Sequence, residues 1–126
     1  MKRLDLVKKI IERKKQLGIS IENLALLSGI SVRTVNRVLQ NKDVKLSTIE
    51  ALTNFLGLDF AGKEVISFKK LQKQRAHEKA IFLASIVQGN SALEMQGLED
   101  DSIKNIISMY EKELLYGTYK KTLWVA

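Results

Sequence analysis

Hydrophobic positions in the first sixty residues recur with the spacing of short amphipathic helices. Residues 20–40 read SIENLALLSGISVRTVNRVLQ, which predicts two helices joined by a tight turn at Gly29, where the backbone needs a positive φ. Ser20 and Ser31 stand where an N-cap is expected for each helix. The positions predicted to face inward are Ile21, Leu24, Ala25, Ser28, Val35, Val38 and Leu39. This stretch therefore predicts a helix-turn-helix.

The same periodicity predicts a helix on each side of this pair. The first covers about residues 4–16, with Arg13 among the basic residues on its outer face. Its inward residues are expected to be Leu4, Val7, Ile10, Ile11 and Leu17. Ser47 and Glu50 have the spacing of a capping box for a fourth helix that ends at Gly57. That helix should bury Ile49, Leu52 and Leu56.

In the second half of the chain, a long helix is expected from about residue 67 to 88. Its first half is polar and basic, whereas its second half is apolar on nearly every side. A helix that is apolar all round is buried on several sides, and a short chain has few other elements to cover it. We therefore expect a homodimer core or a protein-binding surface here. The residues concerned are Ile81, Phe82, Leu83, Ile86 and Val87.

Three further elements are predicted toward the C-terminus. Residues 90–97 contain the capping spacing of a short helix, and Asp100 or Asp101 should cap a last helix that runs to about Tyr116. The tail, residues 118–126, is expected to be extended. Tyr119 and Trp124 in this tail either pack on the last helix or anchor another protein.

The predicted fold class is therefore all-α. A four-helix domain that contains the helix-turn-helix, residues 1–62, precedes a helical extension, residues 63–126, which is expected to serve dimerisation or partner binding. Gly62 interrupts the helical pattern at this boundary.

The outer face of the second helix of the pair carries Arg33, Asn36, Arg37 and Gln40. A helix in the major groove of DNA needs long hydrogen-bonding side chains at this spacing. Arg pairs bidentately with guanine, and Asn or Gln pairs bidentately with adenine. The loop that follows adds Lys42 and Lys45 for backbone phosphates.

Three segments resemble the Cro/C1-type (XRE) helix-turn-helix family of phage repressors, restriction controllers and antitoxins. They are LALLSGIS (24–31), TVNRVLQN (34–41) and LSTIEALTNFLGLDF (46–60), and the likeness extends from about Leu4 to Phe60. The resemblance implies a lambda-repressor-like domain with Val32, Arg33, Asn36 and Arg37 nearest the base edges. Ile21 stands where the family often has Gln. Asn41 stands where it usually has Gly, and Asn is the next residue best able to adopt a left-handed conformation.

Together, these observations give a set of candidate DNA-binding residues. They are Ser20, Ser31, Val32, Arg33, Thr34, Asn36, Arg37, Gln40, Asn41, Lys42 and Lys45.

The positive charge lies toward the N-terminus. Basic against acidic residues number 11 against 6 in residues 1–62, 6 against 2 in 63–80, and 4 against 6 in 81–126. A basic front and a mildly acidic rear indicate a polyanionic partner at one end only. With the helix-turn-helix, that partner is expected to be double-stranded DNA.

The sequence lacks the residues that several other classes of function need. The chain has no Cys, and its one His, His77, lies in a charged stretch typical of a solvated helix. Glu99, Asp100 and Asp101 are expected to serve a helix dipole. We therefore predict no enzyme activity, no metal site and no cofactor. The apolar run 80–87 is too short to span a bilayer, which needs about 20 residues. No membrane role and a cytoplasmic location are expected.

Three functions remain open on the sequence. The first is an antitoxin-like autorepressor that binds an inverted-repeat operator as a homodimer and captures a toxin or other protein through its extension. The second is a stand-alone phage-type or restriction-controller repressor whose extension only dimerises. The third is a protein-binding adaptor whose helix-turn-helix no longer binds DNA.

Overall fold

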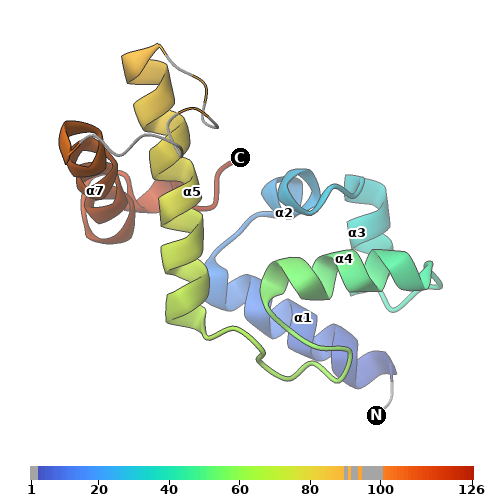
Figure 1. The fold of residues 1–126 in the computed structure, drawn as a ribbon. Helices are drawn as coiled ribbons and strands as arrows, with labels where there is room; N and C mark the ends of the chain where they lie inside the picture. Colours follow the sequence, from blue (N-terminus) through green and yellow to red (C-terminus); the bar gives the residue numbers. More distant parts are fainter. Residues whose placement is uncertain (1–2, 90, 92–93, 95–100) are drawn as a thin grey trace. The chain divides into compact units, whose positions relative to one another are not determined.

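The computed structural model describes residues 3–89, 91, 94 and 101–126, and their regular structure is helical (Figure 1). The elements are α1 (Arg3–Leu17), α2 (Ile21–Ser28), α3 (Val32–Leu39), α4 (Leu46–Leu56), α5 (Phe68–Gln88), α7 (Asp101–Tyr116) and the 3-10 helix η1 (Lys120–Thr122). An isolated antiparallel bridge joins Leu58 and Glu64. The all-α prediction is confirmed.

The chain forms two compact units. One contains Met1–Phe68 together with Trp124–Ala126, and the other contains Lys69–Leu123. We call them the helix-turn-helix unit and the extension, and describe each by itself. The first unit thus continues a few residues beyond the boundary expected at residue 62, and it also includes the last three residues of the chain.

The core of the helix-turn-helix unit draws buried side chains from all four of its helices. The completely buried ones are Ile10, Leu24, Val35, Val38, Leu52 and Leu56. All six were predicted to face inward. Leu4 was also expected to face inward, but it is 47% exposed, and Leu6 is buried in its place. The apolar stripe of α1 is therefore rotated from the predicted one at its first turn.

Local capping fixes the turn between α2 and α3 as predicted. The Ser20 hydroxyl accepts a hydrogen bond from the Asn23 N–H at 3.1 Å, and the Ser31 hydroxyl accepts one from the Thr34 N–H at 3.1 Å. Gly29 has φ 75°, and Asn41, after α3, has φ 57°. The predicted left-handed conformation of Asn41 is thereby confirmed.

The predicted capping box of the fourth helix is wrong. Helix α4 begins at Leu46, one residue before Ser47, and its N-cap is Lys45, which makes no side-chain capping bond. Ser47 therefore lies inside the first turn, where it cannot be the N-cap. The helix still buries Ile49, Leu52 and Leu56 as expected.

Arg13 was predicted to lie on the outer face of α1, but its side chain is buried in the helix-turn-helix unit. It is 4% exposed. Its Nε donates to the Leu56 carbonyl at 2.8 Å, its Nη2 to the Ile66 carbonyl at 2.6 Å, and its Nη1 to the Glu64 carboxylate at 2.7 Å. Arg13 thus ties α1 to the end of α4 and to the segment that leads to α5.

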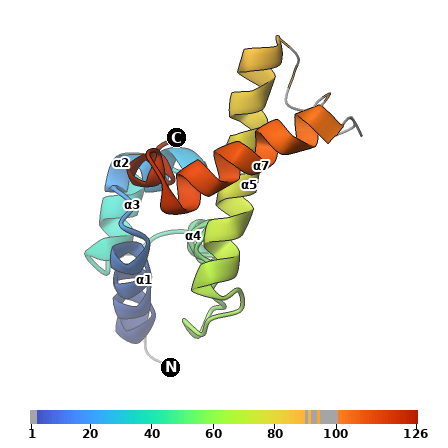
Figure 2. The same ribbon diagram turned by 90° about the vertical axis from the view of Figure 1, so that its left-hand side faces the viewer.

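In the extension, α7 packs across α5 (Figure 2). Buried Ile81 and Ala84 of α5 contact a half-buried set on α7, namely Ile103, Ile106, Ile107 and Tyr110. His77 Nδ1 lies 2.6 Å from a Glu111 carboxylate oxygen and joins the same two helices. The predicted last helix is confirmed. Asp101 is its first residue and therefore does not cap it, and Asp100, the other predicted cap, lies outside the described residues.

The second half of α5 is buried on one side rather than all round. Phe82 is 56% exposed and Ile86 is 62% exposed, and Val87 is equally open. This agrees with the expectation that a short chain has too few elements to cover the helix, because α7 covers one face only; the expected homodimer or partner contact stays a prediction. The predicted helix over 90–97 falls mostly outside the described residues. Within it, Ser91 and Glu94 make the reciprocal bonds of a capping box.

The tail is not extended as predicted, since it forms η1 and then joins the helix-turn-helix unit. Trp124 is 7% exposed and meets Phe55 of α4 edge to face, with ring centroids 5.9 Å apart. The Ala126 N–H donates to the Asn23 side-chain oxygen at 3.1 Å. Trp124 therefore neither straps the last helix nor stands open to another protein, because it packs on the chain's own α4.

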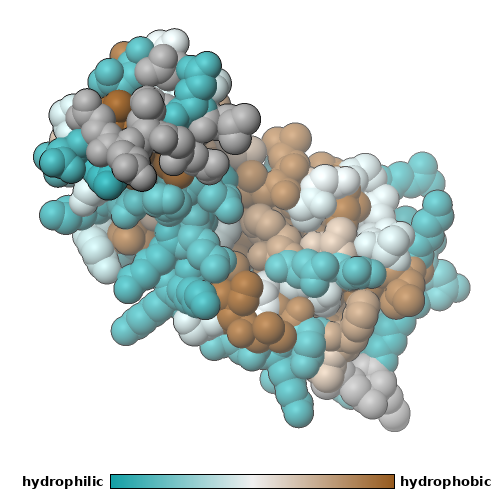
Figure 3. Space-filling view, in the orientation of Figure 1, coloured by the Kyte–Doolittle hydropathy of each residue, from teal (hydrophilic) through white to brown (hydrophobic). Residues whose placement is uncertain are grey.

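Exposed hydrophobic side chains on the helix-turn-helix unit include Leu46, Phe60 and Val65. In Figure 3 brown side chains gather over the connection after α4 and at the start of α4. Within the described part of the chain, no helix is long and apolar enough to cross a membrane.

Candidate nucleic-acid interface

The candidate recognition surface lies on α3, which is anchored by Val35 and Val38 in the core. This anchoring leaves Arg33 and Gln40 exposed and Asn36 half-buried on the other side of the helix. Val32, in the first turn, is 41% exposed. The spacing of these residues places their side chains along one helical face, as a major-groove reading helix requires.

Hydroxyl side chains at the start of α2 and α3 are engaged in the local fold. Ser31 Oγ lies 2.7 Å from Thr34 Oγ1 and also caps the helix, and Ser20 caps α2. Among the candidate DNA-binding residues, these three therefore serve first to fix the direction of the helices. Any contact that they make with a phosphate would add to this role.

Two arginines hold the loop after α3. Arg37 donates from Nη2 to the Asp43 carbonyl at 2.9 Å. From α1, Arg3 forms an ion pair with the Asp43 carboxylate at 2.9 Å, and it also bonds the Lys42 carbonyl. Arg37 was predicted to lie near base edges, whereas the structure makes it half-buried and tied to the loop. Arg3 was missed, since no local signal connects residues 40 positions apart.

Because this loop is held from both sides, its exposed cations are presented on an ordered backbone. Lys42 and Lys45 are both exposed. A hollow of about 320 Å³ beside them is lined by Thr34, Arg37, Asp43, Val44, Lys45 and Thr48. Cations and hydroxyls are the side chains that bind DNA backbone phosphates. The α3 face and this loop thus carry side chains of the kinds that bind base edges and backbone phosphates in DNA.

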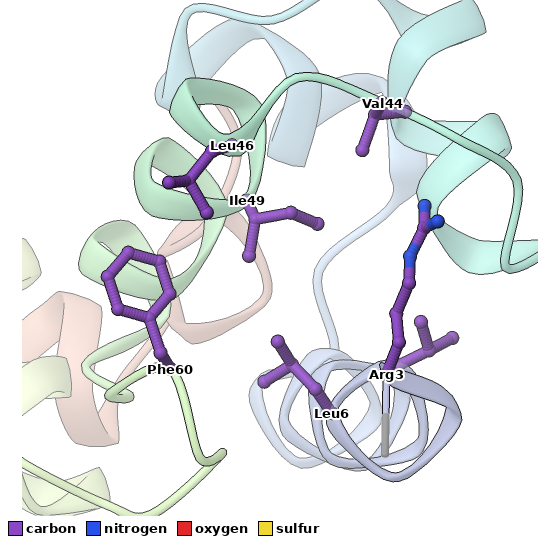
Figure 4. A pocket seen from close by; sticks show the side chains of 7 residues that line it. Arg3, Leu6, Val44, Leu46, Ile49 and Phe60 are labelled. Carbon is purple, nitrogen blue, oxygen red and sulfur yellow. The ribbon is translucent and has the colours of Figure 1, made fainter. Parts of the chain in front are cut away.

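A second hollow in the same unit has a different character. It encloses about 420 Å³, and its lining is apolar apart from Arg3. Figure 4 shows Leu6 coming from α1, Leu46 and Ile49 from α4, and Phe60 from the segment after it. The Arg3 side chain extends away from these residues toward Val44, on the loop (Figure 4). Such a lining does not suit phosphate, so we leave this hollow out of the nucleic-acid interface.

The residues predicted for the dimer or partner interface differ in how exposed they are. Ile81 and Trp124 are buried within their own units, and Leu83 is half-buried. Phe82, Ile86, Val87 and Tyr119 are exposed. Only this second group is available to another molecule without a change in the fold.

A protein-family model described as Helix-turn-helix matches residues 10–63. This segment thus matches the Cro/C1-type (XRE) helix-turn-helix family. This family assignment supports a DNA-binding transcription regulator. Searches of curated proteins and of solved structures each found no significant match.

A metal centre has no support in the described residues. No group of three or more His, Cys, Asp or Glu side chains among them is arranged to hold an ion.

Proposed function

We propose that the protein is an antitoxin-like autorepressor. In this proposal its helix-turn-helix domain binds an operator near its own gene, and its extension binds a partner protein. The protein acts without catalysis, as a homodimer, in the cytoplasm where its DNA lies. The observation that carries the DNA-binding part is the ordered pairing of the α3 face with the loop that Arg3 and Arg37 hold.

Specific reading of DNA rests on the exposed face of α3. Arg33 supplies a fork of donors for guanine, and Asn36 supplies the donor and acceptor that match adenine. Lys42 and Lys45 supply charge that any DNA sequence would attract, with a strong dependence on salt. The homodimer follows because one recognition helix covers too few base pairs to be selective. Two copies would read half-sites about 34 Å apart.

The partner-binding part rests on the open face of α5. Phe82 and Ile86 are one helical turn apart, both are more than half exposed, and Val87 adjoins them. An exposed apolar row of this kind is typical of a protein-binding surface. A repressor whose extension only dimerises would use the same row for a second copy, so the two functions differ in what binds there.

Competition binding tests the DNA-reading part, with the DNA upstream of the gene as probe and random DNA as competitor. Arg33→Ala and Asn36→Ala should each lose about 1–3 kcal/mol of specific binding and keep nonspecific binding. Lys42→Ala should weaken binding to all sequences alike and reduce the salt dependence. If Lys42→Ala alters selectivity while Arg33→Ala leaves it intact, α3 is not the reading helix.

Co-expression with the products of adjacent genes tests the partner. Phe82→Asp should abolish co-purification of the partner while binding to an isolated half-site survives. Gln74→Asp, which adds the same charge at an exposed position of α5, is the matched control. If wild-type protein captures no neighbouring product and Phe82→Asp only abolishes self-association, the stand-alone repressor is the correct function. If Phe82→Asp affects neither co-purification of a partner nor self-association, the apolar part of α5 serves only the fold of the monomer.

A further inference from the structure

The apolar hollow of the helix-turn-helix unit has the size and lining of a small-molecule site. It encloses about 420 Å³, and sites that bind small molecules usually enclose about 300–1,000 Å³. Buried side chains form one part of its lining, namely Leu6 and Val7 of α1 and Ile49 of α4. The other part is open to solvent, since Leu46 is 70% exposed and Phe60 is 52% exposed. A molecule in solution therefore has access to an apolar surface here.

One end of the hollow carries a positive charge. Figure 4 shows the Arg3 side chain reaching from α1 toward Val44, away from the rest of the apolar lining. Its Nη1 pairs with the Asp43 carboxylate at 2.9 Å, and its Nη2 donates to the Lys42 carbonyl. A guanidinium has more N–H donors than these two bonds use. The hollow thus joins an apolar region to a cation that is able to accept a further partner.

The ion pair between Arg3 and Asp43 is open to exchange. The Asp43 carboxylate is fully exposed, and a surface ion pair of this kind contributes little stability because water screens it. A carboxylate from another molecule is therefore able to take the place of Asp43. The pair also shows which anion suits the site, because one guanidinium matches the single charge of a carboxylate, whereas a phosphate monoester carries nearly two charges.

We propose that this hollow binds a small amphipathic carboxylate, a molecule with one carboxylate group and an aliphatic chain. The carboxylate accepts hydrogen bonds from Arg3 in place of Asp43, and the chain lies among Leu6, Ile49 and Phe60. Most of the lining is aliphatic, so the chain gains affinity by leaving water. All of these residues belong to the helix-turn-helix unit. Binding at this site requires neither DNA nor a partner protein.

The loop before α4 separates this site from the candidate phosphate-binding surface. Val44 lines both the apolar hollow and the hollow of about 320 Å³ on the phosphate side. Next to it, Asp43 and Lys45 line the phosphate side, and Leu46 lines the apolar side. A bound carboxylate releases Asp43 from Arg3, so the loop loses a bond that orders it. An occupied site should therefore weaken binding to DNA phosphates, a consequence that rests on the proposed DNA-binding function.

Isothermal titration calorimetry of the full chain with octanoate tests the site without DNA. Octanoate should bind, and affinity should rise by about fourfold for each methylene added from butyrate to octanoate, the factor expected for burying one CH₂ group. Octanol has the same chain without the carboxylate and should bind about tenfold more weakly. If octanoate does not bind, or if octanol binds equally well, the proposal is wrong.

Substitutions of the charged residues test the carboxylate end. Arg3→Gln should weaken octanoate binding about tenfold and leave octanol binding unchanged. Asp43→Asn removes the competing negative charge and should strengthen octanoate binding. Lys8→Gln, at an exposed position of α1, is the control for a lost positive charge and should change neither. Equal effects of Arg3→Gln and Lys8→Gln would show that octanoate responds only to net charge, which contradicts the proposed site.

Substitutions of exposed lining residues test the apolar end without removing a core side chain. Leu46→Ser and Phe60→Ser should each weaken binding of both octanoate and octanol. Val65→Ser changes a residue that is 68% exposed but outside the lining, so it is the matched control. If all three variants weaken binding equally, octanoate adsorbs to exposed apolar surface. If octanoate does not bind and Leu46→Ser weakens self-association, the hollow is an interface between copies. Either result overturns the proposal.

Fluorescence anisotropy with labelled DNA from upstream of the gene tests the effect on the loop. Octanoate should weaken DNA binding by the wild type and have no effect on Arg3→Gln. Protein that binds octanoate but no DNA would contradict the proposed DNA-binding function and support the carboxylate site. Protein that binds both, with a DNA affinity that octanoate does not change, would show that the site does not control the loop.

Discussion

The helix-turn-helix unit and the extension differ in how far their helices cover hydrophobic side chains. Each of α1 to α4 contributes at least one completely buried side chain to the first unit. In the extension, α5 buries Ile81 and Ala84 but exposes Phe82 and Ile86. Both sequences are equally rich in apolar residues over these stretches. The difference lies in the number of helices available to cover them.

Whether an apolar residue is buried depends on how many helices surround it. Four helices enclose a common centre, so the inward stripe of each is covered by the other three. Two packed helices leave each other's far side open. The core of the first unit is therefore enclosed by its own helices, although Leu46, Phe60 and Val65 are exposed on its surface, whereas α5 keeps an apolar face that α7 does not cover.

Arg13→Met should destabilise the helix-turn-helix unit by about 3–4 kcal/mol, because it removes charged donors from two backbone carbonyls and from Glu64. Urea unfolding followed by circular dichroism measures the loss. Lys15→Met, at an exposed position of α1, is the control and should change the unfolding free energy by less than about 0.5 kcal/mol. Equal effects of the two substitutions would show that the buried arginine is not part of the closed core.

Within the extension, Ile81→Ala should cost about 2–4 kcal/mol, because Ile81 packs against α7 and its truncation leaves a cavity. Ile86→Ala, one turn and one residue further along α5, should cost less than about 0.5 kcal/mol in the monomer. Thermal unfolding at low protein concentration separates the two. A large cost for Ile86→Ala under these conditions would mean that its face is covered within the chain.

Sequence reasoning succeeded where the cause of a structure lies within a few residues of it. Ser20 and Ser31 cap their helices, and Gly29 and Asn41 adopt left-handed conformations, because each bond or steric limit involves near neighbours. The inward faces of α2, α3 and α4 followed from periodicity for the same reason. This local information was enough to place the candidate recognition face on α3.

It failed where a residue's environment comes from distant parts of the chain. Arg13 looks like a solvent-facing residue of α1 until Leu56 and Ile66, 43 and 53 positions away, provide its acceptors. The clamp of Arg3 on the loop after α3, and the seat of Trp124 on Phe55, have no pattern in the neighbouring sequence. The chain's length indicated that α5 would lack cover, but periodicity could not say which of its side chains α7 would bury.

The exposed apolar face of α5 is expected to contribute to self-association, whereas an isolated exposed apolar residue is not. Ile86→Ser should weaken self-association about tenfold, which corresponds to about 1.4 kcal/mol. Leu26→Ser removes an equally exposed side chain from α2 of the helix-turn-helix unit and should leave association unchanged. Sedimentation velocity over a concentration series measures both. If Leu26→Ser weakens self-association and Ile86→Ser does not, the interface lies on the helix-turn-helix unit.

The smallest effect is expected at Asn41, where the closed unit relies on a backbone conformation rather than on burial. Its φ of 57° is unfavourable for a residue with a Cβ, so Asn41→Ala should cost about 1 kcal/mol of unfolding free energy. Asn41→Gly should be neutral within about 0.5 kcal/mol, because glycine adopts this conformation without a steric penalty but is more flexible when unfolded. Chemical denaturation resolves the two variants. If Ala is tolerated as well as Gly, the loop after α3 does not hold Asn41 in the left-handed region in solution. The ordered presentation of Lys42 and Lys45 would then need a cause other than the backbone turn.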